Sequence, residues 1–189
     1  YWSKLKTVDS VKSSGDFNLV KKKQYMLKFK NKNFLLPQNI IGKHNYINAI
    51  TAIGVCKELK LAINSQIKAL SNFRGVSKRT DLVSEVDGIK VFDDFAHHPT
   101  AIKSSINSIK ETFIGKRLLT VFVPGSNSMR LGAHDAQLVP SLKKSDRALV
   151  LTKFKSLKRL IGNNIKINVI ETEAQIRDYL DKENNFDII

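Results

Sequence analysis

The stretch that decides the fold reads Lys90-Val91-Phe92-Asp93-Asp94-Phe95-Ala96-His97-His98-Pro99-Thr100-Ala101-Ile102. Its apolar beginning indicates the end of a buried strand, and Pro99 indicates the first turn of a helix, where proline is well tolerated. Two carboxylates and two imidazoles therefore share one short loop. Ligands of open α/β sheets bind at the carboxyl ends of strands, and the N–H groups of a helix start favour phosphate. The alternative is an aspartate pair that caps the helix beside two solvated histidines, but four such groups so close together favour a site.

Length and composition limit the class of protein. A chain of 189 residues with 42% hydrophobic residues can form one large domain or one and a half small ones. Its apolar runs are far shorter than the roughly 20 residues that a membrane span requires, and we expect no secretion signal. The single cysteine, Cys56, excludes an internal disulfide framework and fits a reducing cytoplasm. We therefore expect a cytoplasmic protein without a membrane partner.

The net charge of +15 raises the question of a nucleic-acid partner. The lysines are spread along the whole chain, and the clusters at residues 21–23 and 143–144 are short and lack interleaved aromatic residues. We therefore expect no nucleic-acid binding. The positive field instead favours small anionic substrates.

The first third of the chain changes its pattern near Gly42. Residues 1–36 alternate polar and apolar positions, which predicts two or three antiparallel strands. Apolar residues then recur at three- and four-residue spacing to about Leu59, which predicts an amphipathic helix with Asn45 as its N-cap. A second helix is expected from about Asn64 until Gly75 ends it.

The remainder of the chain alternates between strand and helix patterns. Strands are predicted at residues 82–86 and 89–92, joined by the hairpin turn Asp87-Gly88. The further predicted elements are a helix at 99–113, a strand at 118–123, a helix at 135–142, strands at 148–151 and 167–170, and a helix at 173–180. This alternation predicts an α/β fold with a Rossmann-like, mainly parallel sheet. Residues 186–189 are predicted to begin one more strand, which would leave a hydrophobic sheet edge unpaired.

Two segments resemble the Mur ligase family, the ATP-dependent amide-forming enzymes of bacterial peptidoglycan metabolism. Residues 93–100, Asp-Asp-Phe-Ala-His-His-Pro-Thr, resemble the start of the family's C-terminal domain. Residues 42–49, Gly-Lys-His-Asn-Tyr-Ile-Asn-Ala, are similar to the segment that closes the central ATPase domain. The resemblance implies that residues 1–79 are the C-terminal part of the central ATP-binding domain, and residues 80–189 the C-terminal domain, truncated at its end. Tyr1 also opens without a methionine, so we expect a piece of a longer protein.

The resemblance assigns roles around the nucleotide. The family's two asparagines at the positions of Asn45 and Asn48 hold the adenine ring, and a carboxamide offers the donor and the acceptor that adenine requires. Without the resemblance, a helix cap and a surface residue would be the simpler interpretation. The arginine at the position of Arg79 reaches ATP phosphate, which suits a forked guanidinium. Asp94 is expected at the ribose or a phosphate and is also a catalytic candidate.

The same resemblance assigns roles around the acceptor. His97 is the catalytic candidate beside the reacting carboxylate and amine, and His98 binds substrate or is structural. Residues 124–132, Pro-Gly-Ser-Asn-Ser-Met-Arg-Leu-Gly, resemble the loop of the family's tripeptide-adding branch. The expected substrate-binding residues of this loop are Ser126, Asn127 and Arg130; an ordinary polar turn is the alternative.

This loop departs from the family pattern at two positions. The family's acidic residue before the proline is Val123 here, and its arginine after the proline is Gly125. If that arginine normally holds a carboxylate of the peptide, a charge-assisted contact is lost. Arg117 and Arg130 are the candidates to replace it.

The resemblance implies a ligase that joins L-Ala-γ-D-Glu-meso-diaminopimelate to UDP-N-acetylmuramate through an acyl phosphate. ATP and Mg²⁺ would be the cofactors, and the role would be in peptidoglycan recycling and cell-wall biogenesis, and so in cell shape and division. These residues contain no Gly-x-x-x-x-Gly-Lys-Ser/Thr phosphate loop. We therefore expect the metal ligands mainly outside them and an isolated chain without activity. The alternatives are a ligase that adds L-alanine to UDP-N-acetylmuramate, and a non-catalytic remnant or binding module.

Overall fold

The computed structural model describes residues 17–125, 129, 132–162, 164, 166–183 and 185–189. The chain divides into two compact units, Tyr1–Gly75 and Val76–Ile189. Among the described residues, every helix is too short or too polar to cross a membrane.

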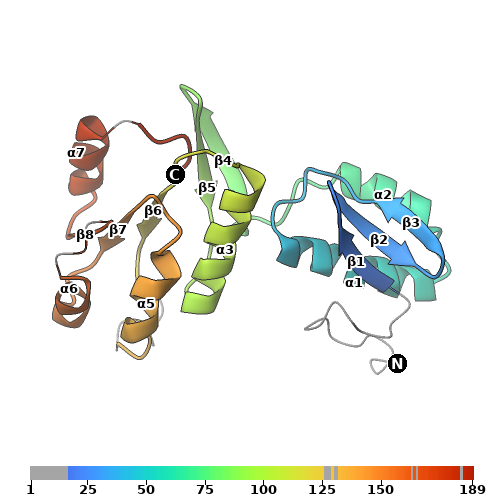
Figure 1. Cartoon of the computed structure of the whole chain (residues 1–189), viewed down its shortest axis with the longest axis horizontal. Helices are drawn as coiled ribbons and strands as arrows, with labels where there is room; N and C mark the ends of the chain where they lie inside the picture. The colour runs from blue at the N-terminus through green and yellow to red at the C-terminus, as the bar shows by residue number, and fades with distance from the viewer. Residues whose placement is uncertain (1–16, 126–128, 130–131, 163, 165, 184) are drawn as a thin grey trace. The chain divides into compact units, whose positions relative to one another are not determined.

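The first unit packs two helices against a small sheet (Figure 1). Strands β1 (Phe17–Lys21), β2 (Tyr25–Phe29) and β3 (Lys32–Leu35) pair antiparallel in that order, and helices α1 (Lys43–Glu58) and α2 (Ile63–Ser71) follow. Their shared core contains the buried side chains of Leu19, Leu27, Leu36, Tyr46, Ile50, Ile53 and Ile63. Alternation in the strands and the three- to four-residue spacing in α1 supply these apolar faces.

Two of the predicted helix ends in this unit are wrong. The N-cap of α1 is Gly42, with φ of 88°, so the chain turns into the helix where only glycine is unstrained. Asn45 lies inside the first turn, and its Nδ2 donates to the carbonyl oxygen of Ile41 at 2.8 Å. Helix α2 ends at Ser71, before Gly75 is reached. Capping propensity pointed to the right region but not to the residue that turns the chain.

The second unit is the predicted α/β domain. Its elements are β4 (Asp81–Val86), β5 (Ile89–Asp93), α3 (Pro99–Thr112), β6 (Leu119–Phe122), α5 (Asp135–Leu142), β7 (Arg147–Leu151), α6 (Lys155–Ile161), β8 (Ile167–Ile170) and α7 (Ala174–Lys182). Strands β6, β7 and β8 are parallel neighbours, and β4 and β5 form the expected hairpin. Helix α6 was not predicted, because only its two buried residues, Leu157 and Ile161, carry a helical period.

The C-terminal residues lie inside this sheet rather than at its edge, which corrects the sequence prediction. Ile188 bridges in parallel to Lys90 of β5 and to Leu118, just before β6. Backbone N–H groups of β5 and β6 donate to carbonyl oxygens of residues 187–189 over 2.8–3.0 Å. The segment therefore connects the β4–β5 hairpin to the parallel strands. Strand alternation identifies a buried strand but does not give its place in a sheet.

Helices cover both faces of the parallel strands. On one face, α7 packs Ile176, Tyr179 and Leu180 against a core formed by Leu119, Leu149, Ile170 and Phe186. Thr120 points to the opposite face, where its hydroxyl bonds that of the buried Ser145 at 2.7 Å. Helices α3 and α5 lie side by side (Figure 1).

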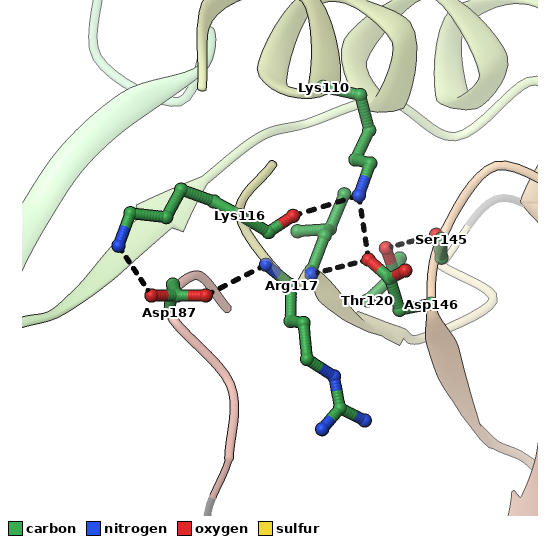
Figure 2. Close-up of polar contacts among 8 residues, drawn as sticks. Lys110, Lys116, Arg117, Thr120, Ser145, Asp146 and Asp187 are labelled. Carbon is green, nitrogen blue, oxygen red and sulfur yellow. Dashed lines mark hydrogen bonds and ion pairs between the residues drawn. The ribbon is translucent and has the colours of Figure 1, made fainter. Parts of the chain in front are cut away.

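A network of hydrogen bonds and ion pairs lies at the amino end of the parallel strands (Figure 2). The Asp146 carboxylate accepts from the Lys110 ammonium at 2.7 Å and from the Leu118 N–H at 2.8 Å. Burial alone would raise the pKa of Asp146, but these hydrogen bonds lower it below its usual value. The ionised carboxylate therefore fixes α3 to the beginning of β6.

Asp187 makes the corresponding contacts from the C-terminal segment that lies between β5 and β6. Its carboxylate accepts from the Lys116 ammonium at 2.7 Å and from the Arg117 N–H at 2.8 Å. These two bonds, Lys116 first, lower the pKa of Asp187. Both carboxylates lie before the strands, at the end opposite the loop that holds Asp94.

Candidate functional site

The side chain of Asp94 joins three parts of the second unit. Its Oδ2 accepts from the Thr80 N–H at 2.9 Å, from the Thr80 hydroxyl at 2.9 Å and from the Ser105 hydroxyl of α3 at 3.0 Å. Its Oδ1 accepts from the Ala96 N–H at 2.8 Å. A carboxylate offers about four acceptor positions, so internal donors already use most of this one.

These bonds hold a linker in an unusual backbone conformation. Thr80 is buried at 6% exposure and has a φ of 52°, which is costly for a β-branched residue. Lys78, with φ of 59°, accepts at its carbonyl from the Phe95 N–H at 2.9 Å. The loop that carries the candidate site thus also anchors the start of the second unit. Neither Thr80 nor Ser105 was singled out from the sequence, because nothing in their spacing marks a contact across the fold.

The two histidines lie exposed on the same loop. Nδ1 of His97 lies 3.0 Å from the carbonyl oxygen of Phe95, and the two rings meet edge to face with centroids 5.1 Å apart. His98 is the N-cap of α3, and its Nδ1 accepts from the Thr100 N–H at 3.2 Å. His97 is therefore the histidine whose side chain does not cap the helix.

A third histidine connects this loop to the segment after β6. The ring of His134, the N-cap residue of α5, packs edge to face on His98 with centroids 4.7 Å apart. His134 was not predicted as a site residue from the sequence, although its place directly before a predicted helix, two residues after Gly132, was a usable signal. Ser126, Asn127 and Arg130 lie outside the described residues, and the expectation about them stays a prediction.

The residues expected at the nucleotide are distributed over both units. Asn45 is half-buried and Asn48 is exposed one turn later on α1, in the first unit. Arg79 is exposed and belongs to the second unit, as does the half-buried Asp94. A nucleotide cleft shared by these residues stays a prediction.

One cavity reaches Asp94 from beneath α3. It holds about 190 Å³ and is lined by Asp94, Ser105, Phe122, Ile188 and other, mainly apolar, residues. Pockets for ligands of nucleotide size occupy roughly 300–1,000 Å³, so this hollow does not fit ATP. Among the described residues, no three His, Cys, Asp or Glu side chains are grouped to hold a metal ion.

Curated relatives carry two different activities in their names. Over 114 residues the chain is 37% identical to the UDP-N-acetylmuramate–L-alanyl-γ-D-glutamyl-meso-2,6-diaminoheptandioate ligase of Haemophilus influenzae, covering 60% of this chain and 25% of the relative. Over 97 residues it is 42% identical to the UDP-N-acetylmuramate–L-alanine ligase of Vesicomyosocius okutanii, covering 49% and 21%. The chain thus spans about a quarter or less of the length of these relatives.

Solved structures agree with the fold. A murein peptide ligase of Psychrobacter arcticus superposes with a TM-score of 0.61 at 27% identity, covering 93% of this chain and 40% of that one. The UDP-N-acetylmuramate–alanine ligase of Thermotoga maritima gives a TM-score of 0.71 at 20% identity, covering 88% and 40%, a likeness of fold alone.

The family model for the glutamate ligase domain of Mur ligases matches residues 78–187, more than half of the chain. The matched range contains the Asp94 carboxylate, the three histidines and all the parallel strands described above. The chain therefore belongs to the Mur ligase family, and its second unit is the family's C-terminal domain.

Proposed function

We propose that this chain is part of an ATP-dependent ligase that joins L-Ala-γ-D-Glu-meso-diaminopimelate to UDP-N-acetylmuramate in the cytoplasm, in peptidoglycan recycling. One observation carries the proposal: the ring of His134, two residues after Gly132, packs on His98 of the histidine loop. His134 follows closely on the segment that resembles the tripeptide-adding branch, which supports a role for that segment beside His97 and His98. The Haemophilus influenzae relative, whose name states this activity, supports the same assignment.

Each residue is proposed to have a separate role in the reaction. The substrate carboxylate becomes an acyl phosphate, and the free amine of the tripeptide then displaces phosphate to form the amide. When bound, ATP with Mg²⁺ supplies the phosphoryl group. Asn45 and Asn48 are proposed to hold adenine, and Arg79 a phosphate. Arg79 is exposed, which leaves its guanidinium accessible to an anion.

The residues proposed to bind the acceptor all belong to the second unit. His97 is proposed beside the reacting carboxylate and amine, while Ser126, Asn127 and Arg130 bind the peptide. Holding two reactants in one geometry accounts for much of the rate of such a bimolecular step. The chain by itself is proposed to be inactive, because it contains no phosphate loop of the Gly-x-x-x-x-Gly-Lys-Ser/Thr type.

A second candidate is the addition of L-alanine to UDP-N-acetylmuramate. It is favoured by the 42% identity to the Vesicomyosocius okutanii relative. Both candidates use the same acyl phosphate and differ only in the amine that attacks it. The acceptor therefore decides between them.

The test is an acceptor comparison with the complete protein that contains this chain. ATP and UDP-N-acetylmuramate are supplied with either the tripeptide or L-alanine, and phosphate release and the new UDP-linked product are measured. We expect a much larger kcat/KM for the tripeptide. A preference for L-alanine would establish the second candidate, and no product with either amine would support a non-catalytic remnant, to which the substitution at Gly125 would point.

A further inference from the structure

The two adjacent histidines contact backbone groups of opposite character. Nδ1 of His97 lies 3.0 Å from the Phe95 carbonyl oxygen, and Nδ1 of His98 lies 3.2 Å from the Thr100 N–H. A carbonyl oxygen only accepts a hydrogen bond, and an amide N–H only donates one. The same ring atom must therefore be a donor in one histidine and an acceptor in the other.

These contacts determine where each neutral ring carries its proton. His97 has its proton on Nδ1, which leaves the lone pair on Nε2. His98 has its lone pair on Nδ1 and its proton on Nε2. The hydrogen bond of one ring nitrogen thus sets the chemistry of the other.

We infer that the loop holds His97 and His98 in opposite tautomers, so that His97 Nε2 accepts the proton of the attacking amine. The role in catalysis rests on the proposed ligase function; the tautomers do not. As the nitrogen of the amine bonds to the acyl carbon, the bond from that carbon to the phosphate oxygen breaks. Phosphate leaves with the electron pair, and the amine's proton moves to Nε2 of His97. The resulting imidazolium keeps its Nδ1–H bond to the Phe95 carbonyl.

The surroundings of the two rings support this division. His97 is exposed, so an incoming amine can reach its Nε2, and the Phe95 ring supports it from the side. His98 is also exposed, but its Nδ1 accepts from the Thr100 N–H and its ring packs on that of His134. His98 is therefore a positioning residue: it fixes the helix start and the neighbouring loop. A backbone or carboxylate acceptor that orients a histidine base is a recurrent arrangement in acid–base catalysis.

The first experiment measures the tautomers directly on this chain. Histidine ring nitrogens are labelled with ¹⁵N, and two-bond correlation spectra are recorded near pH 8, above the ordinary histidine pKa of about 6.5. We expect the His97 signals to show a protonated Nδ1 and a bare Nε2, and the His98 signals the reverse. The variants H97N and H98N assign the signals. The same tautomer in both rings, or averaged signals in either, would overturn the inference.

The second experiment separates capping from proton transfer. His98→Ala should lower the urea midpoint of unfolding because the Thr100 N–H loses its acceptor, and H98N should restore the midpoint. In the complete enzyme, H97N keeps a donor for the Phe95 carbonyl but has no base, and should lower kcat by about 10²–10⁴-fold with little change in KM. The exposed Lys103→Gln on α3 is the matched control and should leave kcat unchanged.

The outcomes distinguish the inference from the proposed function. If the unsubstituted complete protein forms no amide, the ligase proposal fails while the tautomers can still be confirmed. If the enzyme is active but H97N behaves like the Lys103→Gln control, the role given to His97 is wrong. If H98N does not restore the stability lost in His98→Ala, the capping role of His98 is wrong.

Discussion

Asp94 carries more of the local structure than its sequence motif suggests. Its four acceptor contacts tie the linker residue Thr80, the loop amide of Ala96 and the helix residue Ser105 to one carboxylate. The sequence predicted that Asp94 belongs to a site, because a polar pair after a strand is recognisable. It could not predict the three partners, which come from positions up to 14 residues away.

Asp94→Asn should therefore destabilise the second unit. An amide has one accepting atom and would turn N–H groups toward the donors of Thr80 or Ala96, so the free energy of unfolding should fall by about 2–3 kcal/mol. Chemical denaturation followed by circular dichroism measures the change. Asp93→Asn, at an exposed neighbouring position, is the control and should change stability by less than about 0.5 kcal/mol. Equal stability of the two variants would contradict the contacts assigned to Asp94.

The nucleotide role of Asp94 needs a second comparison, in the complete enzyme. Asp94→Ala should weaken ATP binding about tenfold if the carboxylate touches the ribose or a phosphate, a loss of about 1.4 kcal/mol. Ser105→Ala removes one of the internal partners without touching the carboxylate, and should leave the ATP dissociation constant within twofold. An unchanged ATP affinity and rate in Asp94→Ala would remove the nucleotide role.

At the scale of elements, the local sequence predicted individual helices and turns better than it predicted their places in the tertiary structure. The hairpin turn at Asp87-Gly88 was predicted from two residues, and both have positive φ, 52° and 80°. The bounds of α3 and α5 followed from Pro99 and from apolar spacing. Helix α6 and the central position of residues 187–189 were missed, because the first is short and the second depends on strands far away in sequence.

Gly88→Ala tests the turn. A Cβ added at Gly88 would meet no atom within 4 Å, but a φ of 80° is strained for an L residue. The free energy of unfolding of the second unit should therefore fall by about 1–2 kcal/mol. Asp87→Asn is the matched variant, since asparagine also adopts positive φ in such turns, and should be neutral or slightly stabilising. Denaturation of both variants under the same conditions measures the difference. A neutral Gly88→Ala would mean that the turn is not of this type.

Ile188→Ala tests the place of the C-terminal segment. The Ile188 side chain is 2% exposed between β5 and β6, and its truncation should cost about 2–5 kcal/mol in the free energy of unfolding. Ile114→Ala, at 86% exposure, removes the same atoms and should cost less than about 0.5 kcal/mol. Similar losses in the two variants would place residue 188 outside the core.

At the scale of the whole molecule, two carboxylates and the excess of basic residues determine how the stability of the fold depends on pH. The folded chain lowers the pKa of Asp146 and of Asp187, so folding favours their ionised forms. The stabilisation is complete above the unfolded carboxyl pKa of about 3.9 and is lost as the pH falls through the lower folded values. The excess of 32 basic over 17 acidic residues adds repulsion as carboxylates are neutralised.

We therefore expect unfolding in acid that depends on these two carboxylates. Urea midpoints should fall between about pH 5 and pH 2 for the unsubstituted chain, and fall less for the double variant Asp146→Asn with Asp187→Asn, which starts from a lower stability at pH 7. Asp181→Asn, an exposed carboxylate of α7, is the control. An acid response that is identical in the double variant and the control would show that other groups determine it.

Residues 187–189 also join two parts of the second unit that are far apart in the order of synthesis. The β4–β5 hairpin and β6 are synthesised well before the segment that joins them, since Asp187 follows its partner Arg117 by 70 residues. Until then, both halves expose backbone groups and apolar side chains that later become central. Such late, long-range closure slows folding and leaves apolar surface open to association with other chains until the segment is in place.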